Sequence, residues 1–284
     1  MVGSIAVNNI SIFLGPIFFR IKEFVLLCYT VVMFVSMSRK HLALIHGFLE
    51  TPSMWQQVLG HISKKDFVIH TPSIPGHGDN LALPSELTAK SYAQNLWQQM
   101  NIPDDEEVFI IGHSMGGYLA SSIAASRASG IAGLCLFHSK CGEDTTQKKE
   151  DRKRSIKAIT ENKSLYVRTM INSLFHTSKA TGLADVIQKH IMDAMLISEE
   201  AMVAAQTVMM DRPDHILTMQ NRHFPLFYFL GDRDSSLPIE MMKEELAQLP
   251  GAVSHVAAET GHMGHYESNK ETGIFLQRVI LASL

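Results

Sequence analysis

Cysteine is scarce in this sequence, and neither sign of charge dominates. Each of these two features excludes a class of protein. Only Cys28, Cys135 and Cys141 occur among 284 residues, too few for the disulfide framework of a small secreted domain. Lys and Arg total 25 against 28 Asp and Glu, for a formal net charge of -3. Such a balance creates no field that favours nucleic acid, so we expect no nucleic-acid partner.

Long hydrophobic runs are also lacking, even in the most apolar part of the chain. Residues 10–19 and 24–35 are apolar, but neither run reaches the ~20 residues that a membrane-spanning helix needs. No small-residue cleavage pattern follows them. Residues 1–36 are therefore predicted to be separate from a domain over residues 37–284, as an anchor or uncleaved signal, a packed helix, or an artefact of a start assigned too far upstream. We expect a cytoplasmic protein, with membrane contact only if this segment is translated and retained.

From residue 37 onward, apolar runs of strand length alternate with segments of helical periodicity. The expected strands are residues 42–45, 67–69, 108–111, 134–137, 226–230 and 253–257, and the clearest helices are 87–100, 115–125, 239–249 and 270–281. Alternation of this kind is typical of an α/β fold with a mostly parallel, twisted sheet and helices on both faces.

One long stretch interrupts the alternation. Residues 141–215 contain no convincing strand and are rich in charge and methionine, so we predict a helical insertion that forms a lid. The cation-rich run 148–154 is expected to be a solvated helix face, with a binding patch as the alternative. The methionines are expected to pack in the lid core or to line a flexible acyl pocket; they include Met192, Met195, Met202, Met209 and Met210.

The motif with the clearest chemistry lies between an apolar strand and a helix rich in small residues. Gly112–Gly116 has the sequence Gly-His-Ser-Met-Gly, the pattern of a nucleophile elbow that projects Ser114 from the edge of a sheet. Glycines at both ends remove side chains that would collide across so sharp a turn. The positive end of the following helix favours a developing oxyanion. Ser114 is therefore the predicted nucleophile.

An acid and a histidine follow the last two predicted strands. Asp234 and His262 each stand just beyond the carboxyl end of a strand, where parallel sheets form their ligand crevice. With Ser114 they occur in the order Ser, Asp, His that this kind of fold uses. His262 is expected to take the serine proton, and Asp234 to fix the tautomer of that histidine.

Neighbouring residues compete for both roles. Asp232 is a rival for the acid, and His265 is a rival for the histidine. The His262-x-x-His265 pair lacks a third metal ligand, so we expect neither a metal nor a cofactor. Three further histidines are expected to have structural roles in loops and in the elbow, namely His46, His77 and His113.

Together these motifs resemble the α/β-hydrolase superfamily, in particular its compact members with one domain and a helical lid. The matching segments are residues 46–48, 75–78, 112–116, 231–234 and 261–262, so the resemblance covers about residues 40–284. It implies that the backbone N–H groups of Phe48 and Met115 form an oxyanion hole. It also implies a small-molecule acyl substrate.

Three functions stay open at this point. The main expectation is hydrolysis of a carboxylic ester. The segments 46–50 and 112–117 also look like the menaquinone-pathway lyase 2-succinyl-6-hydroxy-2,4-cyclohexadiene-1-carboxylate synthase, which expects an arginine for substrate carboxylates where this chain has Tyr118. A non-enzymatic small-molecule receptor is the third, and the complete set of serine, acid and histidine argues against it.

Overall fold

The computed structural model describes residues 40–62 and 67–283, and the segment 1–36 lies outside them. Six strands form one sheet in the order β2-β1-β3-β4-β5-β6, and every neighbouring pair is parallel. The α/β class and the parallel sheet are thus confirmed. The strands are β1 (Lys40–Ile45), β2 (Phe67–His70), β3 (Val108–His113), β4 (Ile131–Phe137), β5 (Leu226–Gly231) and β6 (Val253–Ala257).

The strand order reverses between β1 and β3. From β1 the chain steps outward to β2, then crosses back over β1 to β3 and continues the other way to β6. Connections that leave in opposite directions open a crevice beyond the carboxyl ends of the two central strands. Phe48 follows β1 and Ser114 follows β3, so both lie at this crevice.

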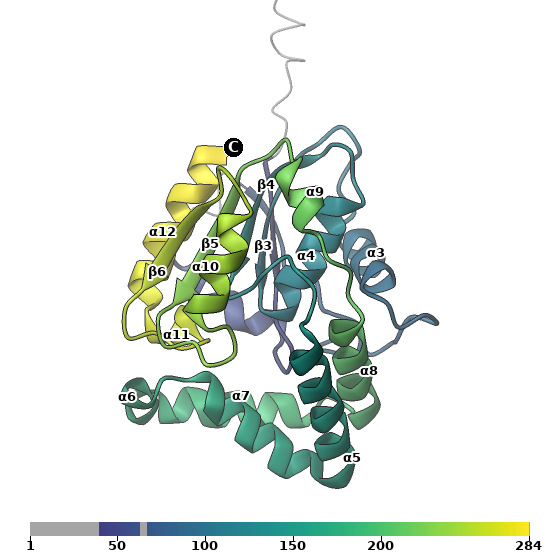
Figure 1. Cartoon of the computed structure of the whole chain (residues 1–284), viewed down its shortest axis with the longest axis vertical. Helices are drawn as coiled ribbons and strands as arrows, with labels where there is room; N and C mark the ends of the chain where they lie inside the picture. The colour runs from purple at the N-terminus through teal and green to yellow at the C-terminus, as the bar shows by residue number, and fades with distance from the viewer. Residues whose placement is uncertain (1–39, 63–66, 284) are drawn as a thin grey trace, which may run out of the picture. The chain divides into compact units, whose positions relative to one another are not determined.

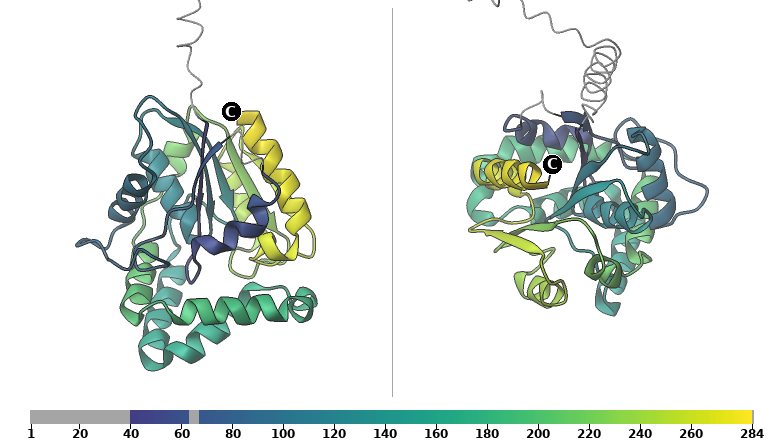
Figure 2. Two further views of the ribbon diagram at one scale, coloured as in Figure 1. Left: turned by 180° about the vertical axis from the view of Figure 1, so that it is seen from behind. Right: turned by 90° about the horizontal axis from the view of Figure 1, so that it is seen from above.

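Helices cover both faces of the sheet, as a parallel sheet requires. The helices α3 (Ala89–Met100), α4 (Met115–Ala125) and α10 (Ile239–Ala247) pack on one face, while α2 (Gln56–Leu59) and α12 (Asn269–Ser283) pack on the other (Figure 2). Alternate residues of each strand feed the two cores, because successive side chains point to opposite faces. In β1, Ala43 and Ile45 belong to the α4 side, and Leu42 and Leu44 to the α12 side.

No strand lies between β4 and β5 in the part of the chain that the structure describes. The helices there are α5 (Thr146–Leu174), α6 (Thr177–Ala180), α7 (Ala184–Met195), α8 (Glu199–Met210) and α9 (Ile216–Gln220). We call α5 to α8 the helical insertion; it lies beyond the carboxyl edge of the sheet (Figure 1). Helix α5 breaks at Asn162, whose side chain accepts a hydrogen bond from the Leu165 N–H and so starts a second helical segment.

The insertion shares its core with the α4 side of the sheet. Ile171 and Met202 are fully buried in that common cluster, and Met209 is 4% exposed. Met192 is 62% exposed, so the expectation that it packs in the lid core is wrong. Between residues 40 and 283, apart from the undescribed 63–66, no helix combines the length and apolarity required to span a bilayer.

Candidate active site

Ser114 occupies a strained turn between β3 and α4. Its φ of 49° and ψ of -117° lie in a region that residues other than glycine rarely adopt. A Cβ on Gly112 would stand 2.5 Å from the carbonyl carbon of Gly116, and one on Gly116 would stand 2.8 Å from that of Ile45. Glycine at both positions therefore lets the helix backbone approach the strands, as predicted.

The end of β4 holds this strained residue in place. The Ser114 N–H donates to the carbonyl of Phe137 at 3.1 Å. The hydroxyl of Ser139 donates to the Ser114 carbonyl at 2.7 Å. Because both backbone groups of Ser114 are bound, its side chain is the part that stays free to meet a ligand.

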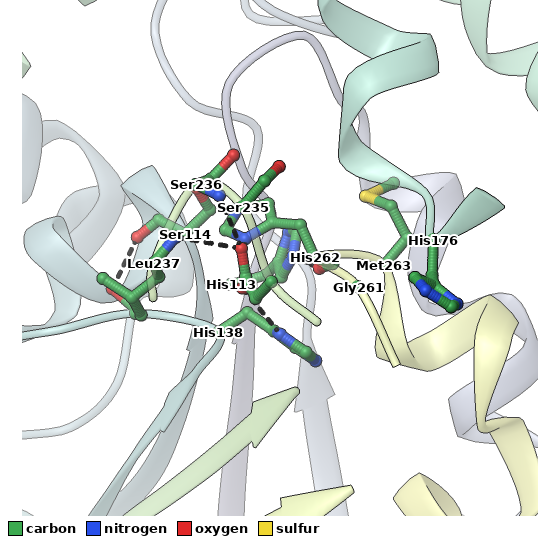
Figure 3. A network of polar contacts seen from close by, with 12 residues as sticks. His113, Ser114, His138, His176, Ser235, Ser236, Leu237, Gly261, His262 and Met263 are labelled. Carbon is green, nitrogen blue, oxygen red and sulfur yellow. Dashed lines mark hydrogen bonds and ion pairs between the residues drawn. The ribbon is translucent and has the colours of Figure 1, made fainter. Parts of the chain in front are cut away.

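His262 and Asp234 meet directly at the same edge of the sheet. Figure 3 shows His262 together with Ser114, His113 and His138. The Nδ1–H of His262 donates to Asp234 Oδ2 at 2.7 Å. The other carboxylate oxygen accepts the backbone N–H groups of Ser236 and Leu237, each at 2.9 Å. Burial alone would raise the pKa of Asp234, but the charge of His262 and the hydrogen bonds to the carboxylate hold it below its ordinary value. The carboxylate therefore stays ionised and fixes His262 with a free Nε2.

Ser114 and His262 line one cavity together with Phe48 and residues of the helical insertion. The cavity is small, with a volume of about 60 Å³ available to the centre of a water-sized sphere. Across residues 40–62 and 67–283, no hydrogen bond joins the Ser114 hydroxyl to His262. Hydrogen bonds of this kind are often long in unliganded enzymes and tighten when substrate binds.

Two backbone N–H groups are available beside Ser114. Met115 is the first residue of α4, where an N–H has no partner within the helix. The N–H of Phe48 donates to no other group among the described residues. His46 shapes the Phe48 loop, since its ring contacts the Gly47 carbonyl at 2.9 Å and accepts the Ile74 N–H at 3.0 Å. Burial lowers the pKa of His46 to about 4, so it is neutral near pH 7.

The two rival residues lie elsewhere. Asp232 accepts the Thr260 N–H at 3.2 Å and contacts neither Ser114 nor the cavity. His265 is fully buried against the rings of Trp55 and Tyr266. The acid and the histidine that the sequence favours are therefore the pair that meets.

His138 was missed by the sequence reasoning. Its Nδ1–H donates to Asp234 Oδ2 at 3.1 Å, the same oxygen that binds His262. Burial lowers the pKa of His138 to about 4, so it is a neutral donor. The three groups are close enough to share a metal ion, but they already satisfy one another as two N–H donors and one acceptor, and an ion would need further ligands. The sequence does contain a signal for His138, because this residue directly follows β4 and so stands at the carboxyl edge of the sheet.

A second buried carboxylate–imidazole pair braces the site, and its acid was also missed. Glu50 accepts both the Gly47 N–H and the Nδ1–H of His113, the latter at 2.7 Å. The Nε2 of His113 faces the His262 carbonyl at 3.0 Å. Both ring nitrogens thus face acceptors, so both carry protons. Burial opposes this charge, but the nearby Glu50 carboxylate raises the pKa of His113 overall. The pair ties the Phe48 loop to the backbone of His262.

The cation-rich run is only partly a solvated face, which corrects the sequence expectation. Lys148 and Arg152 line the cavity with Ser114, whereas Lys149, Lys153 and Arg154 pair with acids at the surface. The two inward residues are four positions apart, so they share one side of α5.

Next to Lys148 and Arg152, one buried carboxylate binds two guanidinium groups. Asp144 pairs with Arg152 and, at 2.8 Å, with Arg212. The guanidinium of Arg212 lies 3.8 Å from the ring centroid of Tyr118. Where the lyase comparison expects an arginine, this chain has a tyrosine with an arginine stacked upon it.

Comparison with known proteins finds a matching family model and relatives that cover most of this chain. The model of the alpha/beta hydrolase family matches residues 42–272. The 2-succinyl-6-hydroxy-2,4-cyclohexadiene-1-carboxylate synthase of Salmonella arizonae is 25% identical, over 80% of this chain and 88% of its own length. The synthase of Escherichia coli O7:K1 is 24% identical over the same shares.

Solved structures with the same fold belong to enzymes with several different activities. A malate-bound thermophilic esterase from Thermogutta terrifontis superposes with a TM-score of 0.79 at 23% identity, covering 87% of this chain and 91% of its own. An enol-lactonase from Burkholderia xenovorans LB400 superposes with a TM-score of 0.76 at 17% identity, covering 86% and 92%. These likenesses establish the fold and leave the substrate open.

Proposed function

Because this chain belongs to the alpha/beta hydrolase family, we propose that it hydrolyses a carboxylic ester of a small substrate through an acyl-enzyme on Ser114. One observation carries the proposal. A strained serine shares a cavity with a histidine whose Nδ1–H is held at 2.7 Å by a buried carboxylate. That arrangement leaves Nε2 of His262 as a base directed at the cavity.

The reaction follows from these positions. The Ser114 hydroxyl attacks the ester carbonyl carbon while His262 Nε2 takes its proton, and the carbonyl oxygen becomes an oxyanion. The N–H groups of Phe48 and Met115 stabilise that oxyanion, a contribution of about 10²–10³ in rate for one such donor. Collapse breaks the ester C–O bond, and the imidazolium returns the proton to the departing alcohol. Water then repeats the sequence on the acyl-enzyme and releases the carboxylic acid.

The test is labelling and turnover with matched variants. Purified protein should react with a fluorophosphonate probe and hydrolyse p-nitrophenyl butyrate, and Ser114→Ala should lose both. Ser126→Ala is the matched control, because Ser126 stands at the far end of α4, where its hydroxyl donates to the Ile123 carbonyl, and it does not line the cavity. Absence of both labelling and turnover in the folded wild-type protein would refute the proposal.

A second candidate uses the same three residues for a lyase reaction. The relatives named 2-succinyl-6-hydroxy-2,4-cyclohexadiene-1-carboxylate synthase favour it, as do the cations that line the cavity. Tyr118 at the expected arginine position counts against it. Release of pyruvate from the menaquinone-pathway intermediate, lost in Ser114→Ala, would establish this activity, and ester turnover without pyruvate release would exclude it.

A further inference from the structure

Lys148 is a cation without a partner inside the cavity of Ser114. Its side chain lines that cavity and is only partly exposed. Its ammonium forms no ion pair or hydrogen bond with any residue of 40–62 or 67–283. Burial, followed by the charge of Arg152, lowers the pKa of Lys148. A partly desolvated charge is costly unless an opposite charge compensates it.

The nearby carboxylates are already occupied. Asp144 is shared between Arg152 and Arg212. Asp151 pairs with Arg154 on the outer side of α5. Asp234 is bound to two imidazoles and two backbone N–H groups. Glu50, the acid that lines the cavity, is paired with a histidine. The side chains around the Lys148 ammonium therefore carry more positive than negative charge that is free to act on a ligand.

The position of Lys148 along its helix adds to that excess. It lies in the first turn of α5, which contains no acidic residue. The amino end of a helix is the positive end of its dipole and disfavours a cation. Its neighbour Lys149 compensates the same disadvantage by pairing with Glu143 at 2.9 Å. For Lys148, the space left for a compensating anion is the cavity itself.

We propose that the substrate of this site carries a carboxylate, which binds the ammonium of Lys148 beside Ser114. The Nε and one terminal nitrogen of Arg152 are already bound by Asp144 and Gln206. The free ammonium beside it is that of Lys148, and its single positive charge matches one carboxylate. The inference rests on the proposed hydrolysis and names its substrate class: esters whose acyl or alcohol part ends in a carboxylate.

The test compares charged esters with neutral esters of similar length. Monomethyl glutarate carries the carboxylate on the acyl side, and methyl hexanoate is its neutral counterpart. 3-Acetoxypropanoate carries it on the alcohol side, and butyl acetate is its neutral counterpart. Hydrolysis is followed by titration of the released acid at constant pH. We expect kcat/KM for at least one charged ester to exceed that of its neutral counterpart about tenfold or more, and the side that prefers charge locates the carboxylate.

The variants separate a specific contact from a general effect on the fold. Lys148→Met should reduce the charged-to-neutral ratio of kcat/KM about tenfold, mainly through KM, and Lys148→Arg should restore most of it. Lys149→Met is the matched control, because that lysine stands one position away outside the cavity, and its ratio should stay within twofold of wild type. An equal loss for charged and neutral esters in Lys148→Met, or a wild-type preference for neutral esters, would overturn the inference.

Binding without turnover distinguishes this inference from the proposed function. Glutarate should bind wild type in calorimetry and bind Lys148→Met about tenfold more weakly, with inorganic phosphate as the competing anion. If glutarate binds through Lys148 but no ester is hydrolysed, the hydrolase proposal fails and the carboxylate site stands. If esters are hydrolysed through Ser114 without a preference for charge, or if phosphate binds in place of glutarate, the carboxylate site fails.

Discussion

Replacement of Asp234 by asparagine tests one hydrogen bond of the candidate active site, because it exchanges an acceptor oxygen for an NH₂ donor. One carboxylate oxygen accepts the N–H groups of Ser236 and Leu237 at 2.9 Å. In Asp234→Asn, the amide oxygen must stay with these two donors, because the amide NH₂ cannot accept from them. The NH₂ group is then directed at the position of the other oxygen, which faces Nδ1 of His262.

That orientation reverses the hydrogen bond to the histidine. An amide donor requires an unprotonated Nδ1, so the proton of neutral His262 moves to Nε2, and the base that should accept the serine proton is lost. The equivalent change in a Ser-His-Asp enzyme of another fold lowers kcat about 10⁴-fold, which corresponds to ~5.5 kcal/mol of transition-state stabilisation. We expect a loss of the same order for Asp234→Asn with p-nitrophenyl butyrate, while reaction of Ser114 with a fluorophosphonate slows in parallel.

Asp232→Asn is the matched control for this prediction. Asparagine keeps the oxygen that accepts the Thr260 N–H, so kcat/KM should stay within about threefold of wild type, since surface substitutions of this type cost little. Thermal melting of both variants checks that each is folded. Equal losses of activity in the two variants would mean that the acid has been assigned to the wrong residue.

Three further expectations concern the supports of the site. Gly112→Ala should abolish folding or soluble expression, because its Cβ overlaps the backbone of α4, whereas Gly182→Ala, with no atom within 4 Å of the added carbon, should change Tm by less than about 1 °C. Glu50→Gln leaves the imidazolium of His113 buried without its anion, which costs about 3–5 kcal/mol and should lower Tm by about 6–20 °C. Burial opposes ionisation of Glu50 and Asp234, but the neighbouring imidazoles lower both pKa values, so their stabilisation is present above pH ~4 and is lost as the pH falls further. Urea unfolding measured from pH 6 to pH 3 should show that the free energy of unfolding falls with pH, and that it falls less steeply in Glu50→Gln. An equally steep fall in Glu50→Gln would contradict the assignment of this pair.

The sheet and the meeting of Asp234 with His262 could be predicted because both depend on local patterns. Strand-length apolar runs fix where each strand ends, and residues just beyond the carboxyl ends of parallel strands converge. The same rule applies to His138, which follows β4 directly. No recognisable motif surrounds His138, however, and nothing in a single sequence shows that its ring turns toward Asp234.

Only the tertiary structure shows which residues of the run 148–154 face the cavity and which face solvent. Its charges suggest a solvated helix, and for Lys149, Lys153 and Arg154 that prediction is correct. Helical spacing alone separates Lys148 and Arg152 from the others. Which of these sides faces the cavity depends on how α5 packs against α8, and the composition of the run contains no information about that contact.

Four histidines crowd the base of the site, and hydrogen bonding decides which of them can act as a base. Both nitrogens of His113 face acceptors and hold their protons. The Nε2 of His138 is buried against Gly264, and both nitrogens of His265 are buried away from the cavity. His113 also lines the cavity and is held by a carboxylate, but its second nitrogen faces the His262 carbonyl. Of these four rings, His262 alone combines a nitrogen held by a carboxylate and a place in the cavity wall with a second nitrogen that has no hydrogen-bond partner among the described residues. Selection of the base therefore follows from where each second nitrogen points, which explains why imidazoles so close together can have different roles.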